Sequence, residues 1–150
     1  MTRKLVGGVT IMFGGAAIVY KTIIQQTIAL SLTEAEFYAL TEAGKLALYI
    51  RHVFSDLGME QMDTTAIYED NRGCVQMTKA MKPTKHTRHV DSKYFAMLEW
   101  VQTDQIVVRK IDTSDNTSDV LTKATGRIIF YRHHNTILGT RVPLYIEKKP

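Results

Sequence analysis

Carboxylates at a few positions of this sequence could do chemistry, and Glu36 is the first. It lies one turn inside the start of a predicted long helix, four residues before Leu40 on the apolar face. Burying an unpaired carboxylate is costly, so Glu36 needs a cation, a hydrogen-bond donor or a metal ion. A capping box with Thr33 as N-cap and Glu36 three residues later is the simpler explanation. Ser31 and Glu34 offer the same box two residues earlier, so both explanations stay open.

Asp70 and Asp119 are the other two candidate acids. Asp70 ends a predicted strand over 65–70, and ligands bind at this end of strands in open α/β sheets. Asp119 opens a short predicted helix. Taken singly, each acid is explained by an N-cap, or by an Asx turn beside Asn71 in the case of Asp70. Taken together, the three carboxylates would suit Mg²⁺ or Mn²⁺. Two such ions about 3.5–4 Å apart can promote hydrolysis of a phosphodiester.

The hydrophobic pattern predicts an α/β protein. Gly14 and Gly15 separate two β-branched runs, which indicates a hairpin from Val9 to Tyr20. The basic start and apolar run also resemble a signal peptide, but the interrupting glycines favour the hairpin. Strand and helix alternation then indicates a mixed sheet flanked by helices. The other predicted strands cover 26–30, 65–70 and 106–111, and the predicted helices cover 33–57, 71–79, 90–103 (with Phe95, Leu98 and Val101 on one face), 119–124 and 127–138.

Composition sets broad limits on the protein. A chain of 150 residues with 45% hydrophobic and 23% charged residues suits one globular domain. The net charge of +4 weakly favours a polyanionic partner. The single cysteine, Cys74, excludes an internal disulfide and fits a reducing, intracellular location, and the apolar N-terminal run is too short for a comfortable membrane span.

Two further groups of residues have competing explanations. A basic stretch from Lys79 to Lys93 could grip backbone phosphates or could simply be solvated. The pair His133 and His134 could suggest zinc, but no Cys or His pair elsewhere has the spacing of a closed zinc site. An ordinary packing or surface role is the simpler explanation for these histidines.

Four motifs are more specific than these patterns. In chain order they are IALSLTEAEF (28–37), YEDN (68–71), HVDSKYF (89–95) and DTSDNTSDVLTK (112–123). They resemble, respectively, the TVALSSTEAEF signature, the DN strand end, the KHIDIRYHF helix start and the PTEDQLADILTK segment of one family. This family is the ribonuclease H domain that closes copia-type retrotransposon polyproteins. The resemblance runs in register and order over nearly all of residues 3–139.

The resemblance implies a fold, an activity and a set of site residues. The fold is ribonuclease H-like α/β, and the activity is metal-dependent cleavage of RNA in RNA:DNA hybrids. Glu36, Asp70 and Asp119 match three of the four acids that bind two Mg²⁺ (or Mn²⁺) ions in this family. An upstream reverse transcriptase domain of the same polyprotein is the implied partner. We assign contacts with nucleic acid to Asn71, Lys82, Lys85, Arg88, His89 and Lys93.

The fourth acid of the family lies on a strand before the segment that matches residues 2–8. No Asp or Glu precedes Glu34 in this sequence. We therefore expect a ribonuclease H-like domain at 1–139 that lacks its first, central strand, and a tail at 140–150. Such a domain would self-associate through the incomplete sheet and would not cleave hybrids as an isolated fragment. A non-catalytic nucleic-acid-binding remnant and a relic reading frame are the alternatives.

Overall fold

The computed structural model describes residues 6–24, 31–80 and 91–143, without the side chains of residues 91–93. The chain divides into two compact units. We call residues 30–110 the central unit, and residues 1–29 together with 111–150 the terminal unit. Helices and strands alternate along the chain, which confirms the α/β class. Within the described ranges, no helix is long and apolar enough to span a bilayer.

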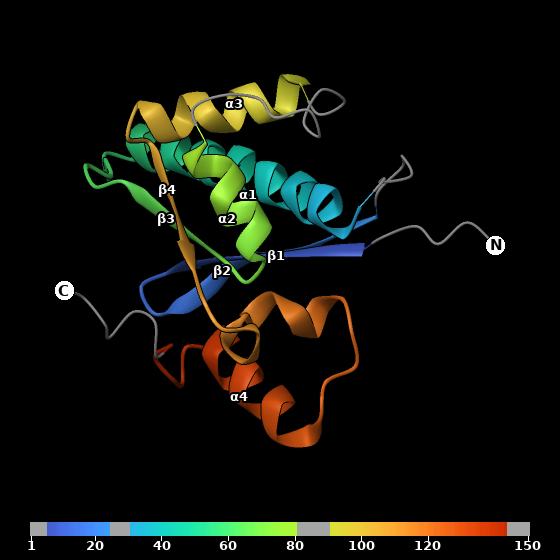
Figure 1. The fold of residues 1–150 in the computed structure, drawn as a ribbon. Helices are drawn as coiled ribbons and strands as arrows, with labels where there is room; N and C mark the ends of the chain where they lie inside the picture. The colour runs from blue at the N-terminus through green and yellow to red at the C-terminus, as the bar shows by residue number, and fades with distance from the viewer. Residues whose placement is uncertain (1–5, 25–30, 81–90, 144–150) are drawn as a thin grey trace. The chain divides into compact units, whose positions relative to one another are not determined.

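A pair of parallel strands and three helices form the central unit (Figure 1). Strand β3 pairs with β4 in parallel, so that Glu69 lies opposite Lys110. Parallel strands need a crossover connection, and α2 and α3 lie in the connection here. The carboxyl ends of both strands therefore lie at one edge. The elements in chain order are α1 (Leu32–Asp56), β3 (Thr65–Glu69), α2 (Arg72–Lys79), α3 (Asp91–Gln102) and β4 (Ile106–Lys110).

Local signals place both ends of α1 where the sequence predicts them. The hydroxyl oxygen of Ser31 accepts a hydrogen bond from the backbone N–H of Glu34 at 3.1 Å, so Ser31 is the N-cap. Gly58 follows the helix with a φ of +73°, a left-handed conformation that favours glycine. Arg51 then holds the loop after the helix, because its guanidinium donates to the carbonyls of Gln61 and Asp63 at 2.6 Å each.

The core of the central unit joins all three helices to β4. The rings of Phe37 and Tyr94 lie 5.7 Å apart between α1 and α3. Of the three residues predicted to share one face of α3, Leu98 and Val101 pack in the core and Phe95 is 51% exposed. Tyr94 and Met97 are buried instead of Phe95. The aromatic residue of α3 that packs in the core is therefore Tyr94, which contacts Phe37, and not its neighbour Phe95. The buried cluster consists of Phe37, Leu40, Cys74, Val75, Tyr94, Met97, Leu98, Ile106 and Val108.

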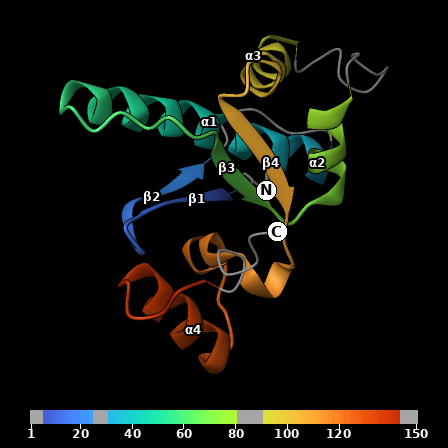
Figure 2. The same cartoon turned by 90° about the vertical axis from the view of Figure 1, so that its left-hand side faces the viewer.

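The terminal unit combines the predicted hairpin with short helices. β1 (Val6–Phe13) pairs antiparallel with β2 (Ala16–Ile24), and Gly14 and Gly15 turn between them with φ of 61° and 88°. Positive φ at both turn residues is what a tight two-residue hairpin requires. Two 3₁₀ turns, η1 (Thr113–Asp115) and η2 (Thr117–Leu121), lead to α4 (Arg127–Ile137). Helix α4 lies against β2, as Figure 2 shows.

Strand β1 and η2 approach each other closely in the terminal unit. A Cβ atom on Gly8 would stand 2.6 Å from the carbonyl oxygen of Ser118, so only glycine fits there. The hydroxyl of Ser118 also donates to the hydroxyl of Thr10 at 3.2 Å, and the hydroxyl of Thr22 donates to the carbonyl of Leu121 at 3.2 Å. The hairpin and η2 therefore pack as one piece.

The helix predicted over 119–124 was wrong in type and position. The side chain of Asn116 accepts a hydrogen bond from the N–H of Ser118, so the turn starts earlier and is a 3₁₀ helix. The described strands pair in two two-stranded sheets. A single mixed sheet, the absence of its central strand and the 1–139 and 140–150 boundaries stay predictions. The strand predicted over 26–30 lies outside the described residues.

Gly44 offers a test of the packing between α1 and α3. A Cβ atom at this position would meet the Trp100 ring at 2.8 Å, so Gly44→Ala should destabilise the chain by about 1–3 kcal/mol in urea unfolding. An ordinary Gly→Ala change inside a helix stabilises by roughly 0.5–1 kcal/mol, so the sign is diagnostic. Adding Trp100→Leu should recover part of the loss. A stabilised Gly44→Ala variant would contradict this close contact.

Candidate acidic site

The candidate site lies at the carboxyl end of β3. Glu69 is the last residue of this strand and is only 8% exposed. Ile67, two residues earlier, packs against the core cluster. Because alternate residues of a strand share a face, the same face carries the Glu69 carboxyl inward. Asp70 follows directly and is half-buried.

Asn71 connects the strand to α2. Its side-chain oxygen accepts a hydrogen bond from the N–H of Cys74 at 3.2 Å, which makes Asn71 the N-cap of α2. Its own backbone N–H donates to Oε1 of Glu69 at 2.8 Å. The cap at this helix is therefore Asn71, and capping does not account for Asp70. The assignment of Asn71 to nucleic-acid binding stays a prediction.

A close contact between α1 and α2 brings Glu36 to the same place. The thiol of Cys74 donates to the carbonyl oxygen of Thr33 at 3.2 Å. A Cβ atom on Gly73 would stand 3.0 Å from the methyl group of Thr33, so this glycine lets the two helix starts approach. Glu36 is half-buried in the first turns of α1. Because Ser31 is the N-cap of α1, a capping box with Thr33 does not account for Glu36.

Glu36, Glu69 and Asp70 interact electrostatically. Loss of solvation is the main cause that raises the pKa of Glu69 from 4.5 to about 7, and the N–H of Asn71 acts against it. The charges of Glu36 and Asp70, together with a hydrogen bond to the side chain of Asp70, raise the pKa of Glu69 further. Burial first, and then the same three carboxylates, raise the pKa of the Cys74 thiol. We call Glu36, Glu69 and Asp70 the acidic cluster.

The third predicted acid, Asp119, belongs to the terminal unit. It lies in η2, where its carboxylate forms an ion pair with Lys123 at 2.7 Å. Asn116 caps this turn, so Asp119 is not the N-cap. Within the residues described, no three Asp, Glu, His or Cys side chains stand together in an arrangement that could hold a metal ion. A metal site made by Glu36, Asp70 and Asp119 therefore stays a prediction.

The donor chemistry of the acidic cluster nevertheless suits a hard divalent cation. Carboxylate oxygens are the ligands that Mg²⁺ and Mn²⁺ prefer. The charges of Glu36 and Asp70 disfavour ionisation of Glu69, and a cation placed among them would reverse that effect. Glu36 and Asp70 are thus the residues of the central unit that could contribute to a metal site.

The basic residues assigned to nucleic acid cannot be placed as a group. Lys82, Lys85, Arg88 and His89 lie outside the described residues, and Lys93 lies in α3 with its side chain outside them. Lys79 is exposed at the end of α2. Contacts of this stretch with phosphates stay a prediction.

Sequence reasoning missed Glu69, which is the most buried acid of the cluster. The signal was present, because Thr65, Ile67 and Glu69 alternate along one strand and Ile67 is apolar. Reasoning from sequence gave His133 an ordinary packing or surface role, and the structure buries its ring, which is only 2% exposed.

The structure thus defines an α/β protein whose central unit carries an acidic cluster at the carboxyl end of a parallel strand. Comparison with known proteins gives a more particular relationship. The chain is 34% identical over 125 residues, 83% of its length, to the retrovirus-related Pol polyprotein from transposon TNT 1-94 of Nicotiana tabacum. It is 28% and 26% identical over 138 residues, 91% of its length, to the Pol polyproteins from transposons RE1 and RE2 of Arabidopsis thaliana.

These relatives identify the chain as a homologue of one region of retrotransposon Pol polyproteins. The chain spans 9% of the length of each relative. No family model matches the chain, and no solved structure matches it.

The raised pKa of Glu69 predicts how stability depends on pH. Between pH 4.5 and about 7 the folded chain keeps a proton on Glu69 that the unfolded chain has lost. This contribution is complete below pH 4.5 and disappears as the pH rises through about 7. A rise from 4.5 to about 7 corresponds to roughly 3 kcal/mol. Urea unfolding between pH 4 and 8 should show this loss.

Glu69→Gln should remove this part of the pH dependence, because the amide stays neutral throughout. Glu60→Gln, at an exposed position after α1, is the matched control and should keep the dependence of the unchanged chain. Equal pH dependence in the Glu69→Gln variant and the unchanged chain would show that Glu69 ionises normally.

Proposed function

We propose that this chain is the ribonuclease H domain of a copia-type retrotransposon Pol polyprotein, and that it hydrolyses the RNA strand of RNA:DNA hybrids when the strand carrying the fourth acid of the family is supplied. The observation that carries the proposal is the acidic cluster at the end of β3, where burial and two neighbouring carboxylates raise the pKa of Glu69 to about 7. The homology with Pol polyproteins supports the polyprotein context. The four motifs described above supply the choice of ribonuclease H among the activities of such a polyprotein.

Glu36, Asp70 and Asp119 would hold the Mg²⁺ or Mn²⁺ ions of this domain. When bound, such ions activate water and stabilise the leaving oxygen of a phosphodiester. Other residues of the chain would support the residues that bind the ions. The Ser31 cap and the contact between Thr33 and Cys74 orient Glu36. With a cation bound, Glu69 would be ionised, and the N–H of Asn71, which donates to its Oε1, would stabilise the carboxylate.

Recognition of the hybrid would depend on its shape and on the 2′-hydroxyl groups of the RNA strand. The basic residues from Lys79 to Lys93 would contact backbone phosphates, and this binding would weaken with salt. The upstream reverse transcriptase domain would produce the hybrid. The resemblance places a fourth metal-binding acid on a strand that these 150 residues do not include, so cleavage in our account requires that strand to be supplied.

Asp70→Asn tests the proposed role of the acidic cluster in metal binding. The variant should bind Mn²⁺ at least about tenfold more weakly in calorimetric titration, because it loses a charged ligand. Asp63→Asn removes the same charge from an exposed position of the central unit and should bind like the unchanged chain. With a peptide carrying the Asp-bearing strand of the family added, the Asp63→Asn variant should cleave a hybrid and the Asp70→Asn variant should not.

The same experiment separates hydrolysis from the alternative, a non-catalytic nucleic-acid-binding remnant. The net charge of +4 is the observation that favours this alternative. Unchanged Mn²⁺ affinity in Asp70→Asn would exclude the metal site. Hybrid binding of equal strength in all variants, without cleavage in any mixture with the peptide, would establish the binding remnant instead.

A further inference from the structure

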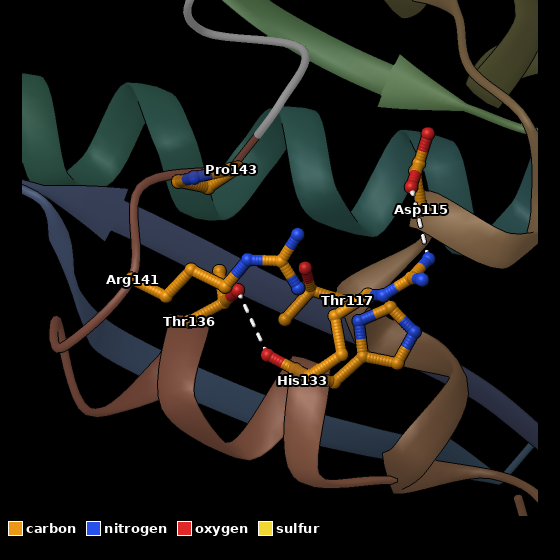
Figure 3. Close-up of a pocket in the computed structure, with 7 residues that line it drawn as sticks. Asp115, Thr117, His133, Thr136, Arg141 and Pro143 are labelled. Atoms are coloured by element: carbon orange, nitrogen blue, oxygen red, sulfur yellow. Dashed lines mark hydrogen bonds and ion pairs between the residues drawn. The ribbon is translucent and has the colours of Figure 1, made fainter. Parts of the chain in front are cut away.

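A polar pocket in the terminal unit is not used by the proposed function. Residues of η1, η2, α4 and the segment after α4 line it, and it is small and partly open to solvent. Figure 3 shows the side chain of Arg141 extending over the pocket and His133 rising from α4 beside it. All of its lining residues belong to the terminal unit.

His133 is the buried polar group of this pocket. Its ring is 2% exposed, and its Nε2 atom has no hydrogen-bond partner among the described residues. An enclosed ring nitrogen has given up its hydrogen bond to water, and most such groups regain one inside a protein. His134, the next residue, is exposed and stacks on Phe130. The two adjacent histidines therefore have different surroundings, and only His133 faces the pocket.

Charges of both signs act on His133: those of Arg132 and Arg141, and those of Asp115 and Asp119. Arg132 and Arg141 line the pocket, and Asp115 is the one acidic residue among the lining residues. The guanidinium of Arg132 lies 3.7 Å from a carboxylate oxygen of Asp115, and both side chains are partly exposed. A long, water-accessible ion pair of this kind is weak. Because a guanidinium has five N–H donors, Arg132 can serve a second acceptor while it stays beside Asp115.

The hydrogen-bonding groups of the pocket are mainly donors. Burial lowers the pKa of His133, and the charges of Arg132 and Arg141 add to this effect, while those of Asp119 and Asp115 oppose it. A neutral imidazole has one N–H donor, which can be placed on Nε2. The hydroxyl of Thr136 already donates to the carbonyl oxygen of Arg132 at 3.1 Å.

We propose that this pocket binds a phosphate group, with the Nε2–H of His133 donating to one oxygen and the guanidinium groups of Arg132 and Arg141 contacting the others. The planar donors of arginine match the oxygens of phosphate well. The phosphate comes either from the backbone of a nucleic acid or from free inorganic phosphate. This site is independent of the proposed hydrolysis, because it shares no residue with the acidic cluster.

Nuclear magnetic resonance of the full 150-residue chain with ¹⁵N-labelled histidine tests the site. Inorganic phosphate is titrated at constant ionic strength. In a separate titration, a short RNA:DNA duplex is added in a buffer without inorganic phosphate. The His133 ring signal should shift and saturate with at least one of the two. Arg141→Gln should weaken that binding by about tenfold, because it removes a charged donor. Arg127→Gln removes the same charge from an exposed position of α4 outside the pocket and should bind within twofold of the unchanged chain.

His133→Phe provides a second readout, since it keeps the ring and removes the nitrogen. The variant should fold, and the ligand that saturates the signal should no longer raise its melting temperature. Saturation by the duplex alone identifies a backbone phosphate as the occupant, and saturation by inorganic phosphate identifies the free ion. Absence of saturation with both ligands overturns the proposal, as does equal weakening by Arg127→Gln and Arg141→Gln. The comparison of the two arginine variants decides the matter even if His133→Phe does not fold.

Discussion

The burial of the Glu69 carboxyl at the end of β3 is the constraint on which the acidic end of the central unit depends. An ionised carboxylate in such a place is costly unless a proton, a hydrogen bond or a cation compensates it. The N–H of Asn71 supplies one hydrogen bond, and the same residue caps α2. Asn71 therefore serves two groups: its backbone N–H bonds the Glu69 carboxyl, and its side chain bonds the start of α2. Glu36 and Asp70 add negative charge, so the cluster favours a proton on Glu69, and a cation in its place is our proposal.

Local chemistry explains which parts of the fold could be predicted. The hairpin and α1 follow from signals that act within a few residues, namely the pair Gly14 and Gly15, the Ser31 cap and the stop at Gly58. The errors concern tertiary choices. Phe95 and Tyr94 are both aromatic neighbours on α3, and only the position of Phe37 on another helix decides which one is buried. Similarly, Glu69 and Asp70 are adjacent acids, but the core buries Glu69 and leaves Asp70 only half-buried.

The candidate site shows the same division between local and distant information. The sequence indicated Glu36 and Asp70 as partners, and both belong to the acidic cluster. It could not indicate that Asn71 would take the capping role from Asp70, since Asp and Asn are equally good N-caps. The role of Asp119 in metal binding stays a prediction, because Asp119 lies in η2 of the terminal unit and its carboxylate pairs with Lys123. The pocket at His133 was also invisible, because its lining residues come from separate turns and from α4.

Anomalous diffraction from crystals soaked in Mn²⁺ can show whether Glu36 and Asp70 hold a divalent cation, as we propose. We expect an anomalous peak about 2.0–2.2 Å from carboxylate oxygens of both residues. The peak should disappear when the soak contains a chelator and return when Mn²⁺ is restored. A fully soaked crystal with no peak at these two residues, or with Mn²⁺ bound only at other acids such as Glu42 or Asp104, would contradict the account.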